Sequence, residues 1–109
     1  MLRLTLKAGE SSFLTVLKLF GNVPSPGMMS FPIPGATLTL DFPHRGERTL
    51  RLLDDLDRVA MQAGGRVNPY KDARMSAATF EASFPHWRDF ACHVDPAFSS
   101  SFWRRVTSA

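Results

Sequence analysis

The stretch between residues 21 and 35 constrains the fold of this chain more than any other feature. It holds four prolines and three glycines. Proline lacks a backbone N–H and fixes φ, and glycine weakens both helices and strands, so no regular element can run through this stretch. The chain must therefore be built from short elements on either side of a long loop.

Segments on both sides of the loop have the composition of β-strands. Residues 11–20 are rich in Phe, Leu, Val and Thr. Residues 36–42 alternate Leu and Phe on one face with Thr and Asp on the other, which is typical of a half-buried strand. Residues 2–7 carry leucine at every second position and predict another short strand. Residues 66–68 are a further strand candidate.

Helices are predicted in the second half of the chain. Apolar residues recur at helical spacing over residues 47–63, and Gly64-Gly65 then provides a left-handed stop. Ser76 is a good N-cap for a helix that ends near residue 83, and shorter helices are expected over residues 85–94 and 99–105. This order predicts a single α+β domain over residues 1–109, a small mostly antiparallel sheet covered by helices on one face.

Composition excludes some classes of function and leaves others open. The net charge is +3, but Lys and Arg are scattered, so we expect no nucleic-acid partner. The single cysteine, Cys92, excludes an internal disulfide, and we expect its thiol to be buried and inert. No apolar run is long enough for a membrane span or a secretory signal, so we expect a cytoplasmic protein.

Few residues are arranged for recognisable chemistry. The chain holds no Gly-x-Gly-x-x-Gly motif and no P-loop, and its three histidines are dispersed, so we expect no metal site. Isolated polar groups remain as site candidates: Lys18, Thr37, Thr39, Asp41, Tyr70, Lys71, Asp72 and Arg74. Each also has a structural interpretation, such as a solvated lysine in a turn or a threonine chosen for its β-propensity.

Several short motifs, taken in order, resemble one protein family. They include Val16-Leu17-Lys18-Leu19-Phe20-Gly21, the strand that ends in Leu40-Asp41-Phe42-Pro43, and Lys71-Asp72-Ala73-Arg74 just after Ala63-Gly64-Gly65-Arg66-Val67. Further matching segments are residues 30–35, 52–57, 75–80 and 94–96. This set resembles the carboxy-terminal region of FAD-linked oxidases of the vanillyl-alcohol oxidase type, in the branch of the decaprenylphosphoryl-ribose and sugar-lactone oxidases.

The resemblance implies roles for particular residues. Lys71 would reach the flavin and the substrate, where a cation stabilises the charge that appears on reduction. Lys18 and Phe20 would contact a sugar or its phosphate. Thr37 and Thr39 fall on the strand that lines the pocket in the family. There the family pattern Gly-aromatic-Asn-x-Cys-x-Asp-Phe-Pro keeps its Gly, Asp, Phe and Pro in this chain, but its aromatic, Asn and Cys are replaced.

Two functions follow as expectations. In the first, the chain is the substrate part of an FAD-dependent oxidoreductase that acts on a sugar or alcohol hydroxyl. The amino-terminal FAD-binding domain is then absent, so the chain would be inactive and would not bind FAD alone. Its partner would be a separate FAD-binding domain or subunit. In the alternative, the chain is a self-associating binding or assembly module without catalytic activity. A homo-oligomer is expected in either case, because the uncovered face should be apolar.

Overall fold

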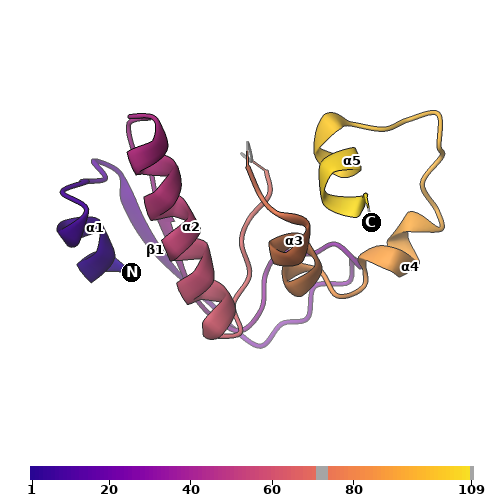
Figure 1. The fold of residues 1–109 in the computed structure, drawn as a ribbon. Helices are drawn as coiled ribbons and strands as arrows, with labels where there is room; N and C mark the ends of the chain where they lie inside the picture. Colours follow the sequence, from indigo (N-terminus) through magenta and orange to yellow (C-terminus); the bar gives the residue numbers. More distant parts are fainter. Residues whose placement is uncertain (71–73, 109) are drawn as a thin grey trace.

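The computed structural model describes residues 1–70 and 74–108. Within them the chain forms two strands and five helices (Figure 1). In chain order these are α1 (Leu2–Lys7), β1 (Thr15–Phe20), β2 (Gly35–Leu40), α2 (Glu47–Gln62), α3 (Ala77–Ser83), α4 (Trp87–Ala91) and α5 (Ser101–Thr107). This is the predicted α+β class, with a small antiparallel sheet and helices beside it.

The sheet of the described residues is a two-stranded antiparallel hairpin. Thr15 lies opposite Leu40, and the pairing continues in register to Phe20 opposite Gly35. The loop between the strands carries the prolines and glycines of residues 21–34, as expected. At the open end, the Ser12 hydroxyl accepts a hydrogen bond from the backbone N–H of Asp41 at 2.9 Å and so holds the two strand ends together.

Residues 2–7 form the helix α1, so the predicted strand is wrong here. Leu, Arg and Lys are good helix formers, and a leucine at every second position does not oppose a helix only six residues long. The helix ends at Ala8, and Gly9 follows with φ of 62°. Leu2 and Leu6 are four residues apart and therefore lie on one side of α1.

The long helix α2 confirms the strongest prediction from the sequence. It buries Leu52 and Leu56 and places Glu47 in its first turn, near the positive end of the helix dipole. The chain leaves it through Gly64, with φ of 67°. Its amino-terminal end is tied to the segment after α1, because the fully buried carboxylate of Glu10 lies 3.5 Å from Arg45 and 3.2 Å from Arg48.

A second packing centre lies at the other end of the chain. Its buried residues are Met75, Phe80, Phe84 and Val106. The Phe80 ring makes near-perpendicular contacts with Phe102 and Trp103, at centroid distances of 5.7 and 6.1 Å. The side chains of Ser76 and Ser100 cap α3 and α5, and the Ser76 cap was predicted. Half of the aromatic residues of the chain thus lie in or against this core.

Two expectations for the second half need correction. Residues 66–68 form no strand, because the N–H of Val67 donates to the Ser83 hydroxyl at 3.1 Å instead of to a sheet. Cys92 is exposed rather than buried, and it lies at the carboxy-terminal end of α4, a helix without buried residues. Helix α4 itself is shorter than predicted and ends at Ala91.

The two ends of the chain form two lobes (Figure 1). One lobe contains α1, the hairpin and α2, and the other contains α3, α4 and α5. The loop before β2 bridges them, because Met29 and Phe31 pack on the aromatic core and Arg66 donates to the Ser30 carbonyl at 2.6 Å. The radius of gyration is 15.1 Å, against about 13 Å for a compact domain of this length. No helix in the described part of the chain is long and apolar enough to cross a membrane.

Replacing the central ring of the aromatic core should be strongly destabilising. Phe80 is 1% exposed and touches four other rings. We expect Phe80→Ala to lower the free energy of unfolding by about 3–5 kcal/mol, because it opens a cavity that the core cannot refill. Urea denaturation followed by the fluorescence of Trp87 and Trp103 measures the change. The control is Phe98→Ala, at a position 77% exposed. A loss of equal size in both variants would contradict this account of the core.

Candidate functional site

The register of the hairpin gathers four predicted site residues on one face. Side chains on a strand alternate between its two faces. Lys18 and Phe20 of β1 therefore share a face, and the pairing places Thr37 and Thr39 of β2 on the same face. We call this surface the lysine face and define it as Val16, Lys18, Phe20, Thr37 and Thr39.

Cross-strand pairs give the lysine face its geometry. Lys18 lies directly opposite Thr37, and Val16 lies directly opposite Thr39. Opposed residues in an antiparallel pair have Cβ atoms about 4.5–5.5 Å apart. Lys18 and Thr39 are exposed, whereas Val16, Phe20 and Thr37 are half-buried. The exposed ammonium of Lys18 and the exposed hydroxyl of Thr39 thus lie beside three half-buried side chains.

Sequence reasoning missed two members of this neighbourhood. Val16 is two residues before Lys18, and the period of two along a strand already predicts that they share a face, but Val16 was not among the candidate site residues. Gly35 lies opposite Phe20 with φ of 141°, a backbone conformation that side chains rarely adopt. Because Gly35 has no side chain, nothing on β2 stands opposite the Phe20 ring.

The opposite surface of the hairpin is of a different kind. We call it the leucine face and define it as Thr15, Leu17, Leu19, Ala36, Leu38 and Leu40. It carries no charged residue. The hairpin therefore has one face suited to a polar ligand and one suited to an apolar partner.

The predicted cation Lys71 and its neighbour Asp72 lie outside the described residues. Tyr70, just before them, is exposed and its backbone N–H is bonded to the Asn68 side chain at 2.9 Å. Arg74, just after them, forms ion pairs with Asp54 at 2.7 Å and with Asp57 at 3.0 Å. These ion pairs link the start of the described residues 74–108 to α2.

The lysine face can bind and orient a ligand, but it offers little for proton transfer. A lysine ammonium is a compact point charge suited to phosphate. Threonine hydroxyls donate and accept hydrogen bonds, and a phenyl ring supplies an apolar wall. Neither a carboxylate nor a histidine is a member of this face. Elsewhere among the described residues, no group of three or more His, Cys, Asp or Glu side chains could hold a metal ion.

The start of α2 lacks the usual arrangement that binds the pyrophosphate of a dinucleotide. A pyrophosphate is usually held by a glycine-rich turn that opens a helix after a strand. The glycine before α2, Gly46, has its N–H turned to the His44 ring nitrogen at 3.1 Å, and Arg45 and Arg48 beside it face Glu10. The Gly46 N–H and the two arginines, which could bind phosphates at that end of α2, therefore already interact with His44 and Glu10.

Comparison with known proteins supports the resemblance deduced from the motifs. The chain aligns over 108 residues with decaprenylphosphoryl-beta-D-ribose oxidase of Mycolicibacterium smegmatis. The alignment covers 92% of the chain, and the two sequences are 39% identical within it. The chain is homologous to a carboxy-terminal segment of that oxidase. It is also 40% identical over 96 residues, 84% of its length, to an uncharacterized protein in the mprA 5' region of Streptomyces coelicolor.

Both relatives are much longer than this chain. The matched regions make up 22% of the oxidase and 26% of the Streptomyces protein, so the chain spans about a quarter or less of their length. No model of a protein family matches the chain. The whole oxidase thus contains a large part that has no counterpart in these 109 residues.

The geometry of the lysine face should depend on Gly35. A side chain at Gly35 meets no atom within 4 Å, so Gly35→Ala adds backbone strain without a clash. We expect it to destabilise the hairpin by roughly 1–3 kcal/mol, because alanine rarely adopts φ of this sign. Amide hydrogen exchange of β1 and β2 reports the change. Gly21→Ala is the matched control, since Gly21 has open space and no positive φ, and faster exchange in both variants would show that φ is not the cause.

Proposed function

We propose that this chain is the substrate-binding part of an FAD-dependent oxidoreductase that acts on a hydroxyl group of a sugar or alcohol. The observation that carries the proposal is the convergence of Lys18, Phe20, Thr37 and Thr39 on one hairpin face. The family resemblance implies a role in substrate binding for each of these four residues, and the strand pairing brings them together. The Mycolicibacterium relative of the chain is an oxidase, which agrees with the proposed class of reaction.

Each member of the lysine face has a role in this proposal. Lys18 binds an anionic group of the substrate, and its exposure lets the ammonium follow that group. Phe20 packs against the apolar side of a sugar ring. Thr37 and Thr39 hydrogen-bond to sugar hydroxyls from the opposite strand. Together they orient the substrate, which lowers the entropic cost of reaction.

The substrate class that fits best is a phosphorylated sugar. The Mycolicibacterium relative is named for decaprenylphosphoryl-beta-D-ribose, which contains a phosphate and a sugar. Lys18 is the one charged group of the lysine face, so it is the natural partner of such a phosphate. Thr37 and Thr39 stand where the family carries an Asn and a Cys, and on the lysine face they imply a pocket of different shape.

FAD enters this proposal only through a part of the enzyme outside these 109 residues. In the complete enzyme, FAD would accept a hydride from the carbon that carries the reacting hydroxyl. We propose that a separate FAD-binding domain or subunit holds the cofactor, and that this chain alone is inactive. Lys71 is proposed as the cation nearest the flavin, and this role rests on the resemblance alone.

A second candidate function is a self-associating assembly module. It is favoured by the exposure of large apolar side chains on the hairpin, such as Leu17 at 67% and Leu19 at 81%. Exposed apolar surface of this kind commonly marks an interaction site. Light scattering of the purified chain over a range of concentrations distinguishes a homo-oligomer from a monomer.

Phosphorylated sugars should bind through Lys18. We expect the chain to bind ribose 5-phosphate, with shifts of the Thr37 and Thr39 amide signals in a nuclear magnetic resonance titration. Lys18→Met should weaken this binding about 10- to 100-fold, because it removes a charge-assisted contact. Lys7→Met in α1 removes an equally exposed charge and is the control. Unchanged affinity in Lys18→Met would remove the lysine face from the proposal.

The purified chain should not bind FAD. We expect no saturable quenching of FAD fluorescence when the chain is titrated, because in this proposal the phosphate-binding groups lie outside these 109 residues. Adding the rest of a related oxidase should restore flavin binding to the mixture. Tight binding by the chain alone would show that it carries a cofactor site of its own.

A further inference from the structure

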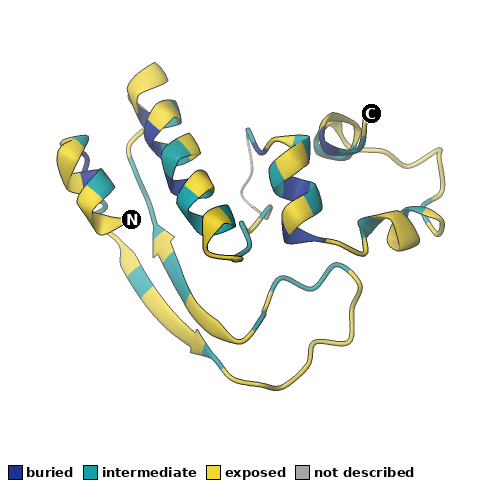
Figure 2. Cartoon of the chain, turned by 60° about the horizontal axis from the view of Figure 1, so that its bottom comes forward, coloured by how far each residue is buried: buried dark blue, intermediate teal, exposed yellow. Residues whose placement is uncertain are grey.

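Asp41 is a candidate site residue that the proposed function does not use. It directly follows β2, and the alternation of side chains along a strand places it in one row with Thr37 and Thr39. Neither strand of the hairpin carries a buried residue (Figure 2), so this row is accessible to a ligand. Asp41 therefore lies directly beyond the lysine face, at the open end of the hairpin.

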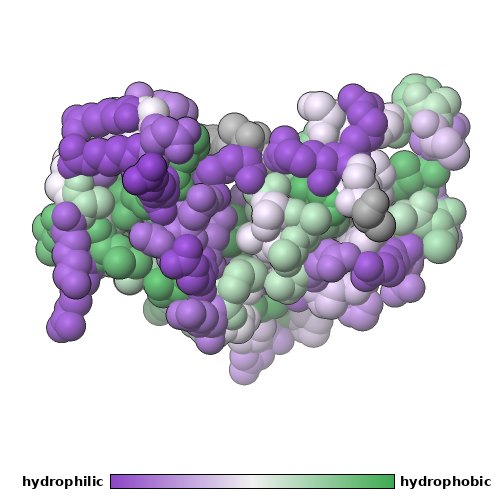
Figure 3. Space-filling model, viewed as in Figure 1, coloured by the Kyte–Doolittle hydropathy of each residue, from purple (hydrophilic) through white to green (hydrophobic). Residues whose placement is uncertain are grey.

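The carboxylate of Asp41 differs from the other shielded carboxylates of the chain. Asp41 is half-buried, yet its carboxylate forms no ion pair or hydrogen bond with any residue that the structure describes. The other buried or half-buried carboxylates in the described ranges each form an ion pair with an arginine: Glu10, Asp55, Asp57 and Glu81. Two of these pairs lie on α2, where hydrophilic side chains gather in Figure 3. Glu47, which also has no ion pair within residues 1–70 and 74–108, is exposed.

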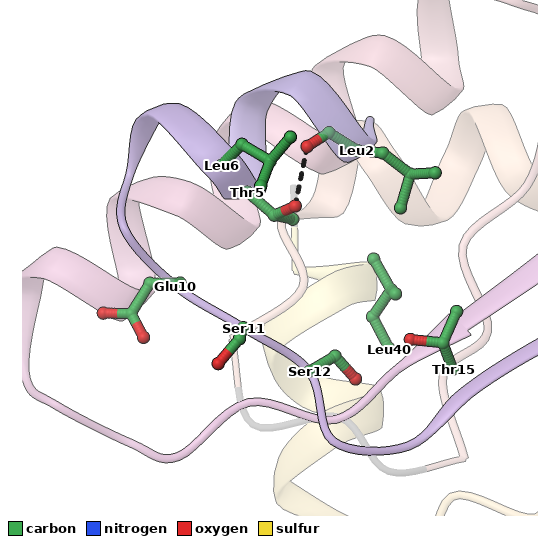
Figure 4. A pocket seen from close by; sticks show the side chains of 8 residues that line it. All are labelled: Leu2, Thr5, Leu6, Glu10, Ser11, Ser12, Thr15 and Leu40. Atoms are coloured by element: carbon green, nitrogen blue, oxygen red, sulfur yellow. Dashed lines mark hydrogen bonds between the residues drawn. The ribbon is translucent and has the colours of Figure 1, made fainter.

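The arginines that follow Asp41 in the chain are directed to another carboxylate. Arg45 and Arg48 lie 3.5 and 3.2 Å from Glu10, and Arg48 also donates to the Ala8 carbonyl at 3.1 Å. Figure 4 shows the Glu10 carboxylate pointing away from Leu40, the residue before Asp41. A partly desolvated carboxylate is stabilised by hydrogen-bond donors. Because the chain does not supply them, a ligand that brings donors to Asp41 gains binding energy there.

The backbone of Asp41 is held in place at the open end of the hairpin. Its N–H donates to the Ser12 hydroxyl at 2.9 Å, and this hydroxyl donates to the Leu14 carbonyl at 2.6 Å. Ser12 lies beside Leu40, and both line the same hollow (Figure 4). Lys18 lies opposite Thr37, four residues before Asp41. At about 3.3 Å per residue, the lysine and the aspartate are thus about 13 Å apart along the strands.

We propose that Asp41 orients a phosphorylated sugar by accepting hydrogen bonds from two adjacent hydroxyl groups while Lys18 binds the phosphate. This inference rests on the proposed function and narrows its substrate class to sugars with two free neighbouring hydroxyls. An ionised carboxylate only accepts hydrogen bonds, and it has two oxygens to do so. Carboxylates bind ribose hydroxyls in this way in dinucleotide-binding proteins. Thr37 and Thr39 lie between the two ends of the ligand, beside its ring.

The opposite charges at the two ends of the row determine the direction in which the sugar lies. A phosphate is attracted by Lys18 and repelled by Asp41, so the hydroxyl groups point toward the open end of the hairpin. The reverse orientation would place two anions side by side. An oxidase must bring one particular carbon of its substrate to the flavin, and a fixed orientation of the bound sugar serves this purpose. Asp41 therefore acts as a residue that determines specificity.

Binding of three ligands by the 109-residue chain tests the proposal. The ligands are ribose 5-phosphate, 2-deoxyribose 5-phosphate and inorganic phosphate, and the amide signals of Thr37 and Thr39 report their binding. We expect the wild-type chain to bind ribose 5-phosphate about 10-fold more tightly than the deoxy sugar, because the deoxy sugar lacks one of the two hydroxyls. In Asp41→Ala the two sugars should bind with equal affinity, and inorganic phosphate should bind at least as well as to the wild type.

Two further variants separate recognition of the sugar from changes in charge and folding. Glu47→Ala removes the exposed carboxylate at the start of α2, and it should keep the preference for ribose 5-phosphate. Asp41→Asn keeps the size of the side chain and the backbone bond to Ser12, so it tests the same point if the alanine variant unfolds. We expect Asp41→Asn to lose most of the preference, because an amide has one acceptor oxygen and no charge.

The outcomes separate the role of Asp41 from the proposed function. Equal affinity of the wild-type chain for the two sugars, with phosphate binding that Lys18→Met weakens, would contradict the role of Asp41 alone. A preference that survives in both Asp41 variants would also overturn it, as would an equal loss of all three ligands in those variants. No binding of sugar phosphate or phosphate by the wild-type chain would overturn the proposed function and, with it, the role of Asp41.

Discussion

The register between β1 and β2 is the constraint on which the rest of this structure depends. The pairing of Thr15 with Leu40 decides which side chains of each strand share a face. A shift by one residue would bring Lys18 opposite a leucine position and would mix the polar and apolar rows. The register thus creates both the lysine face and the leucine face.

The two lobes contribute differently to stability. Aromatic rings around Phe80 form a well-packed centre at the carboxy-terminal end, and the loop before β2 is anchored there through Met29 and Phe31. The hairpin has no comparable core, since Leu17 and Leu19 are exposed to solvent. The buried Glu10 with its two arginines holds α1 to the start of α2, although an ion pair of this kind is costly to desolvate. The lobe that carries the candidate site is therefore the less well packed one.

Much of the secondary structure could be predicted, and the failures have physical reasons. The long helix, its glycine stop and the Ser76 cap are local features, because their hydrogen bonds form within a few residues. Residues 2–7 were predicted wrongly, because alternating leucines fit either a strand or one and a half turns of helix. The exposure of Cys92 was missed, because burial depends on what packs over a residue. For the candidate site, the period of two predicts that Lys18 and Phe20 share one face of their strand and that Thr37 and Thr39 share one face of theirs. It does not predict that the two pairs lie on the same face of the hairpin.

The sequence by itself determined that this chain has short elements around a proline-rich loop, an amphipathic helix after it, and motifs shared with an oxidase. These are properties of local composition and order. Only the tertiary structure decided that Lys18 stands opposite Thr37 and that Leu17 and Leu19 face solvent. The physical reason is that strand pairing across the loop is a long-range choice of register, and that solvent exposure depends on which elements are present to cover a face.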